Sequence, residues 1–69
     1  MVSNLGENIR HRREEYDIEQ KELAQRLFVS AAMINRIEQG TKDPSVSLLV
    51  QIAQVLNCTV NDLIYNKSA

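Results

Sequence analysis

The sequence has few of the residues that cross-link, interrupt or rigidify a chain. Of its 69 residues, two are glycine, one is proline, one is cysteine, one is histidine and none is tryptophan. A single cysteine excludes an internal disulfide framework, and one cysteine with one histidine cannot complete a tetrahedral zinc site. Two isolated glycines provide no glycine-rich loop to hold a phosphate group. We therefore expect one small domain with no cofactor and no metal ion.

Charge of one sign and long apolar runs are also lacking. The net charge is −1 and the isoelectric point is about 5.7, which argues against coating nucleic acid by bulk charge. No apolar run approaches the roughly 20 residues that span a membrane, and the first residues lack the apolar segment of a signal peptide. No nucleophile stands beside a base, because His11 lies between arginines, so we expect no enzyme. The lone cysteine fits a reducing compartment, and we expect a cytoplasmic protein.

Helical periodicity is what the sequence does have. Apolar residues recur at the spacing of a helix, which advances about 100° per residue, and no long stretch alternates as a strand would. We therefore predict an all-α fold of five short helices. The first runs from 5 to 16, with Asn4 as its N-cap and Glu7 completing a capping box. Its apolar stripe consists of Leu5, Ile9 and Tyr16.

The second and third helices follow closely on each other. We predict the second over 20–27, with a buried side formed by Leu23, Ala24 and Leu27 and joined by Ile18. The third lies between Ser30 as N-cap and Gly40 as a left-handed stop. Its spacing predicts a buried face of Met33, Ile34 and Ile37, with Glu38 at the margin. Its exposed face is predicted to hold Ala31, Ala32, Asn35, Arg36 and Gln39.

The fourth helix is apolar over more than half of its circumference. Pro44 and Ser45 begin it, and Asn57 can end it in the left-handed region. Its predicted core stripe is Val46, Leu49, Val50, Ile52, Ala53 and Leu56, which Leu48 and Val55 widen. So wide an apolar surface predicts a helix that is central or touches a second chain. Thr59 and Asp62 form a capping box for a short last helix.

The middle of the chain, QKELAQRLFVSAAMINRIEQG, resembles the helix-turn-helix of the Cro and lambda-repressor-like family, also called the XRE family. The matching residues are Gln20, Leu23, Ala24, Val29, Ser30, Ile34, Ile37, Glu38 and Gly40. The resemblance extends from about Leu5 to Ile64. It implies a single domain over residues 1–69 with an ordered core over about 5–64, in which helices two and three form the motif.

Several positions depart from the family pattern. The family usually has glycine where Asp17, Phe28 and Asn57 stand, because the chain turns there with positive φ. Aspartate and asparagine tolerate that geometry better than other residues, whereas phenylalanine there costs about 1 kcal/mol. We predict that Phe28 nevertheless adopts positive φ in the turn, with its side chain partly exposed.

The resemblance also assigns contacts with double-stranded DNA. In the family the third helix enters the major groove, and base-reading side chains come from the positions of Ala31, Ala32, Asn35 and Arg36. Alanine can touch a thymine methyl, arginine favours guanine and asparagine favours adenine. The alternatives are that Arg36 touches only phosphate and that Asn35 is merely solvated. Phosphate contacts are expected from Gln20, Ser30, Thr41 and Lys42, although Lys42 could be a plain loop lysine.

Two further contacts are expected. Arg13, at the inner edge of the first helix, should form an ion pair with Glu38, and the resemblance implies the same pair. A domain this small gains affinity by pairing, so we expect a homodimer on an operator. Its candidate interface is the apolar surface left over after the core is filled, namely Leu48, Val55, Val60, Ile64 and Tyr65.

The sequence therefore favours sequence-specific DNA binding by a transcriptional regulator, most simply a repressor. The alternative is a protein-interaction or antitoxin-like module on the same fold, which the acidic isoelectric point and the two alanines favour. A fold resemblance alone does not decide between them.

Overall fold

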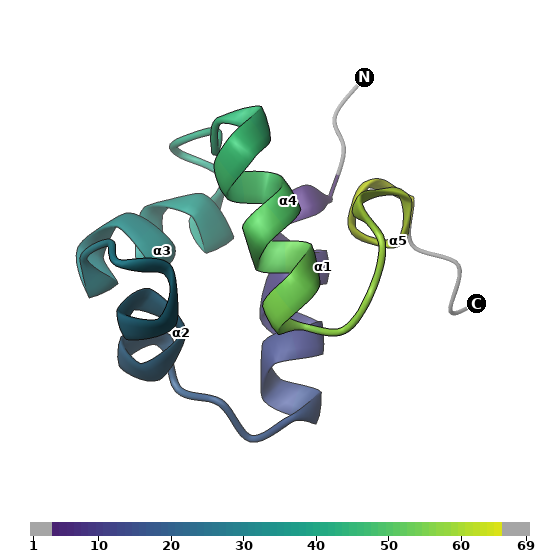
Figure 1. Ribbon diagram of the computed structural model, residues 1–69. Helices are drawn as coiled ribbons and strands as arrows, with labels where there is room; N and C mark the ends of the chain where they lie inside the picture. Colours follow the sequence, from purple (N-terminus) through teal and green to yellow (C-terminus); the bar gives the residue numbers. More distant parts are fainter. Residues whose placement is uncertain (1–3, 66–69) are drawn as a thin grey trace.

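The computed structural model describes residues 4–65, and within them the chain folds into five α-helices (Figure 1). Their bounds are α1 Leu5–Glu15, α2 Gln20–Leu27, α3 Ala31–Gln39, α4 Val46–Val55 and α5 Val60–Ile64. The all-α prediction is confirmed, and the described part of the chain contains no strand. None of these helices is long and apolar enough to cross a membrane.

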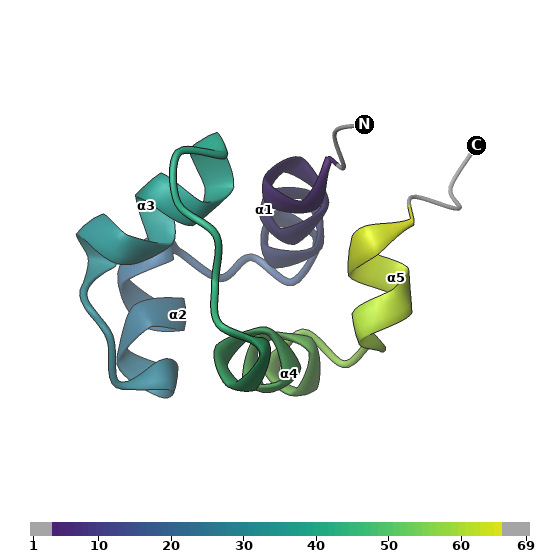
Figure 2. The ribbon, with the colours of Figure 1, turned by 90° about the horizontal axis from the view of Figure 1, so that it is seen from above.

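The helices enclose one core. Figure 2 shows α1 between α3 on one side and α5 on the other, while α4 closes the opposite side. Accordingly α1 packs against α3 and α5, and α4 packs against α2 and α5. The pair α2 and α3 therefore projects at one edge of the molecule, with α5 at the far edge (Figure 1).

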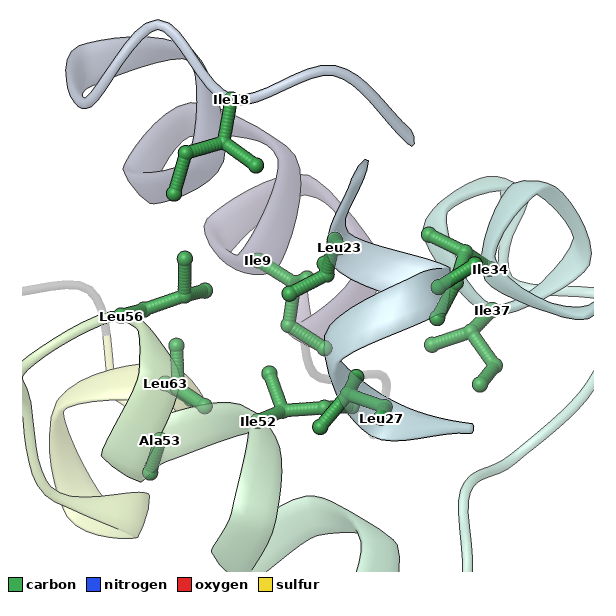
Figure 3. Close-up of a cluster of buried hydrophobic side chains, with 11 residues drawn as sticks. Ile9, Ile18, Leu23, Leu27, Ile34, Ile37, Ile52, Ala53, Leu56 and Leu63 are labelled. Carbon is green, nitrogen blue, oxygen red and sulfur yellow. The ribbon is translucent and has the colours of Figure 1, made fainter. Parts of the chain in front are cut away.

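The core is built from branched aliphatic side chains that all five helices contribute (Figure 3). The largest fully buried side chains are Ile9, Leu23, Ile34, Ile37, Ile52, Leu56 and Leu63. Burying one such side chain contributes roughly 1.5–3 kcal/mol. The predicted inward face of α2 is confirmed, because Ile18, Leu23, Ala24 and Leu27 are buried. On α3, Ile34 and Ile37 are buried as predicted, whereas Met33 is only half-buried and Glu38, predicted at the margin, is buried.

Helices α1 to α4 end in the same way. Each is followed by a residue with positive φ, which is Asp17 (56°), Phe28 (59°), Gly40 (82°) or Asn57 (56°). The amide of the next residue then returns to a carbonyl oxygen five positions back at 2.9–3.1 Å: Ile18 to Arg13, Val29 to Ala24, Thr41 to Arg36 and Cys58 to Ala53. This pattern is the Schellman motif, which satisfies carbonyl groups that a helix end would leave unpaired.

The predicted N-cap residues occupy the N-cap positions of α1, α3, α4 and α5, but the side-chain capping bond forms only in the last three. The hydroxyls of Ser30, Ser45 and Thr59 accept hydrogen bonds from the amides of Met33, Leu48 and Asp62, and Asp62 completes the capping box of α5. Asn4, however, makes no side-chain capping bond. Its φ of −90° and ψ of 39° differ from the extended geometry that directs a capping side chain towards the first turn. Tyr16 lies beyond α1 and is 47% exposed, because the chain turns away at Asp17.

The predicted core stripe of α4 was also partly wrong. Val46 is 79% exposed and Val50 is 40% exposed, whereas Ile52, Ala53 and Leu56 are buried. The half-buried residues Leu48, Leu49 and Val55 pack against the core beside them. A helix that is apolar over more than half of its circumference does not reveal which edge its neighbours cover. Here the covered arc is shifted towards Leu48 and Val55, and the edge that carries Val46 and Val50 is left open.

Candidate nucleic-acid interface

The turn between α2 and α3 holds the two helices in a fixed relation. Ala24 is 2% exposed where α2 packs against α3, so its small side chain permits the close approach. Phe28 adopts φ 59° and ψ 39°, and Ser30 returns to extended geometry before capping α3. The left-handed geometry at Phe28 is confirmed. Its side chain is 94% exposed, well beyond the partial exposure expected.

The outer face of α3 carries the predicted reading residues. Ala31, Ala32 and Arg36 are exposed, and Asn35 is half-buried at the margin of that face. The opposite side of the helix is fixed in the core by Ile34 and Ile37. The structure thus brings the four predicted residues together on one side of a helix at the edge of the molecule.

A buried ion pair fastens α3 to α1. Arg13 Nε lies 2.6 Å from Glu38 Oε2 and its Nη2 lies 3.1 Å from Oε1. The two side chains are only 10% and 3% exposed. The third guanidinium nitrogen, Nη1, donates to the carbonyl oxygen of Ile18 at 2.7 Å. The hydrogen bond to Glu38 raises the pKa of Arg13, and this outweighs the opposing effect of burial. The pair expected from the sequence is therefore present and its charges are compensated.

Gln20, the first residue of α2, is joined to the same carboxylate. Its Nε2 donates to Glu38 Oε1 at 2.9 Å and to Asn35 Oδ1 at 3.3 Å. The side chain therefore turns towards α3 and links a buried carboxylate to a residue on the outer face.

The expected phosphate contacts Ser30, Thr41 and Lys42 are all exposed and lie at the two ends of α3. Ser30 caps the front of the helix. Thr41 Oγ1 donates to the carbonyl oxygen of Arg36 at 3.2 Å, so it also closes the back of the helix. These side chains frame the outer face at both ends, whereas Gln20 approaches it from α2.

Residues 9–63 match the helix-turn-helix family. This chain belongs to that family. It is 38% identical over 55 residues to an uncharacterized HTH-type transcriptional regulator of Archaeoglobus fulgidus, covering 80% of this chain and 79% of that protein. The DNA-binding domain of the P22 c2 repressor matches with a TM-score of 0.90 and 27% identity, over 100% of this chain and 92% of that one. The P22 c2 repressor in complex with a synthetic operator matches with a TM-score of 0.88 and 27% identity, over 96% and 100% of the two chains. The Cro and lambda-repressor-like resemblance is therefore confirmed.

Two residues that hold the helices together were missed by the sequence analysis: Gly6, which lets α1 approach α3, and Asn8, which joins α1 to α5. A Cβ atom on Gly6 would lie 2.5 Å from the carbonyl oxygens of both Ile37 and Glu38, so α1 approaches the end of α3 more closely than any side chain permits. A glycine inside a predicted helix is the signal that could have revealed this contact. Asn8 is 7% exposed and donates to the carbonyl oxygen of Leu63, which no sequence signal marked.

The candidate dimer surface of this helix-turn-helix domain is only partly exposed. Leu48, Val55 and Val60 are half-buried and pack against the core, so each offers only part of its side chain to a second chain. Ile64 is 36% exposed and Tyr65 is 61% exposed, so these two remain available.

Proposed function

We propose that this domain is a transcriptional regulator that binds double-stranded DNA sequence-specifically and reads the major groove with α3. The observation that carries the proposal is the outer face of α3, where small and polar side chains stand exposed on a helix locked from behind. Ile34 and Ile37 fix its depth in the core, and the Arg13–Glu38 pair fixes its rotation. A structural relative bound to its operator supports the same use of the fold.

Each residue of the outer face then has a role set by its chemistry. Ala31 and Ala32 let the helix approach the base edges and can touch a thymine methyl group. Arg36 supplies a planar donor pair that matches the O6 and N7 atoms of guanine. Asn35 supplies a second polar contact. Ser30, Thr41 and Lys42 are placed to meet phosphate oxygens at the ends of α3, which sets the register without reading sequence.

The finer assignments are parts of the same proposal. The regulator acts as a repressor in the cytoplasm, because occupying DNA is the simplest regulatory act of so small a domain. It binds as a homodimer, with no metal ion and no membrane. Half-sites should lie about 34 Å apart, one turn of the duplex. Ile64 and Tyr65, exposed near the end of α5, are the residues that support this pairing.

A protein-interaction or antitoxin-like module on the same fold is the second candidate. Two observations favour it: the net charge of −1, and the exposure of Phe28 at 94% and Val46 at 79%. Large exposed apolar side chains are common in protein-binding surfaces. The outer face of α3 contains neither of these residues, so the two candidates use different surfaces.

Selection from random duplex DNA tests the proposal. The protein is incubated with a random duplex library at low salt, bound duplexes are amplified, and the enriched sites are titrated over a series of salt concentrations. We expect a two-fold symmetric site whose binding constant falls steeply with salt, because bound phosphates release counterions. Failure to enrich any sequence, with salt-insensitive residual binding, would contradict the proposal and favour the protein-interaction module.

A further inference from the structure

Glu38 determines how the amide of Gln20 is oriented. A carboxylate paired with a guanidinium accepts hydrogen bonds and donates none, and Glu38 Oε2 lies 2.6 Å from Arg13 Nε. The side-chain atom of Gln20 that lies 2.9 Å from Glu38 Oε1 must therefore be the nitrogen. The Gln20 oxygen is left on the other side of the amide.

The same reasoning extends one residue further, to the outer face of α3. The Gln20 nitrogen has two hydrogens, and the second is directed to Asn35 at 3.3 Å. Because a donor faces it, the Asn35 atom at that position must be the oxygen. The Asn35 nitrogen is then left on the side of the amide away from Gln20.

We propose that Glu38 is a positioning residue that sets the hydrogen-bond polarity of the reading surface. Through Gln20 it makes Asn35 present an N–H donor to the duplex. This inference rests on the proposed function and deepens it. It also differs from the expectation for Gln20: with both Nε2 hydrogens held by Glu38 and Asn35, its side chain has no donor left for a phosphate.

A donor at Asn35 restricts the bases that it can read. Guanine N7 and O6, adenine N7 and thymine O4 all accept in the major groove, whereas cytosine offers only its N4 donor there. We therefore expect Asn35 to discriminate against cytosine at the base that it contacts. Arg36 takes no part in this hydrogen-bond chain, so its base preference should not depend on Glu38.

The polarity is tested first in the free protein, by hydrogen exchange of side-chain amides in NMR spectra. In the unmodified protein both Gln20 side-chain hydrogens should exchange slowly and those of Asn35 quickly. Glu38→Gln places an N–H₂ group against Gln20, so the Gln20 amide should rotate by a half-turn, and the Asn35 amide should rotate with it. Slow exchange should then move from Gln20 to Asn35. Fast exchange of the Gln20 hydrogens in the unmodified protein would overturn the proposal.

The DNA-level test compares base preferences from the same random-duplex selection. In Glu38→Gln, Asn35 should present its oxygen to the duplex. The base selected at that position should then change from one that offers an acceptor to one that offers a donor, and affinity for the original site should fall roughly tenfold. Gln20→Ala keeps the Arg13–Glu38 pair, so it replaces Glu38→Gln as the test variant if Glu38→Gln does not fold. It should relax the sequence preference only at the base pair that Asn35 contacts. A uniform loss for all duplexes would mean instead that Gln20 or Asn35 binds phosphate, and it would overturn the proposal.

The control is Gln25→Ala, an exposed glutamine on the same helix, which should leave exchange and base preference unchanged. The two levels of the test separate two failures. If no duplex is enriched by the unmodified protein, the proposed function fails while the exchange measurement still decides the orientation of the amides. If DNA is selected but Gln20→Ala and Glu38→Gln leave every base preference intact, only the polarity proposal fails.

Discussion

The side-chain amide of Asn8 donates a 2.7 Å hydrogen bond to the main-chain carbonyl oxygen of Leu63, 55 positions further along the chain. This bond joins the second turn of α1 to the end of α5, and both residues are buried. A short terminal helix such as α5 has little stability of its own, so it depends on contacts of this kind. The bond therefore holds α5 in place over the core.

Asn8→Ala should destabilise the domain by about 1–3 kcal/mol, because it leaves the buried Leu63 carbonyl oxygen without a donor. The measurement is chemical denaturation followed by circular dichroism. Asn61→Ala, on the exposed side of α5, is the matched control and should change stability little. Equal effects of the two substitutions would contradict a special role for Asn8.

Gly6→Ala should destabilise the domain by at least roughly 1–3 kcal/mol, because the added methyl group meets the backbone of α3. Gly40→Ala is an informative comparison. No atom lies within 4 Å of its added Cβ, so it should cost only the strain of φ +82°, about 1 kcal/mol. Thermal denaturation of the two variants gives their losses of stability, which report lack of space at Gly6 and backbone strain at Gly40. The prediction fails if Gly6→Ala is the milder of the two.

Phe28→Gly should be neutral or stabilising by up to about 1 kcal/mol. Glycine relieves the strain of φ 59°, although it adds freedom to the unfolded chain. Little apolar burial is lost, since the side chain is 94% exposed. Phe28→Ala retains the strain and should leave stability within about 0.5 kcal/mol of the parent. A marked loss in both variants, measured by urea denaturation, would show that the phenyl ring contributes to folding.

Stability at alkaline pH should depend on Cys58. Burial raises the pKa of the Cys58 thiol, and the nearby charge of Arg12 opposes this less strongly. Above the ordinary thiol pKa of about 8.5, the unfolded state therefore binds fewer protons than the folded state, and stability falls as pH rises. Denaturation midpoints between pH 8 and pH 10 should fall less steeply for Cys58→Ala than for the parent. Identical slopes would contradict the prediction.

Arg36→Ala should relax base preference on a selected operator and weaken its binding by about 1–3 kcal/mol. The guanidinium is exposed on the outer face of α3, where it can reach a base edge. Lys42→Ala should instead weaken binding to all duplexes alike and lower the salt dependence. Titrations against the selected site and a scrambled duplex distinguish these patterns. Uniform loss with Arg36→Ala would assign Arg36 to phosphate.

Much of this fold follows from local chemistry that the sequence displays. The bounds of α2 and α3 were predictable because Ser30 is a strong cap, Gly40 a strong stop, and Leu23 and Ile34 lie at helical spacing. Which edge of α4 is covered was not predictable. Val46 and Leu48 are equally apolar, and only the placement of α2 and α5 distinguishes them.

The candidate site was predictable as a set of positions but not as a hydrogen-bond network. Its residues follow from the helical face and the family resemblance, and so does the ion pair between Arg13 and Glu38. The orientation of Gln20 does not follow, because a glutamine at a helix start can face solvent or its neighbour with equal ease. Only the position of the Glu38 carboxylate, set by the packing of α1 against α3, decides between these orientations.

The shared ending of helices α1 to α4 bears on how the chain finds this fold. Each connection is directed by one left-handed residue and by hydrogen bonds that span only a few positions. Such turns can form before distant segments meet, so the entropy of closing long loops is a small part of the folding barrier. Mainly local contacts are typical of domains that fold within microseconds to milliseconds. The long-range bond from Asn8 to Leu63 would then form late, completing a topology that the turns have already set.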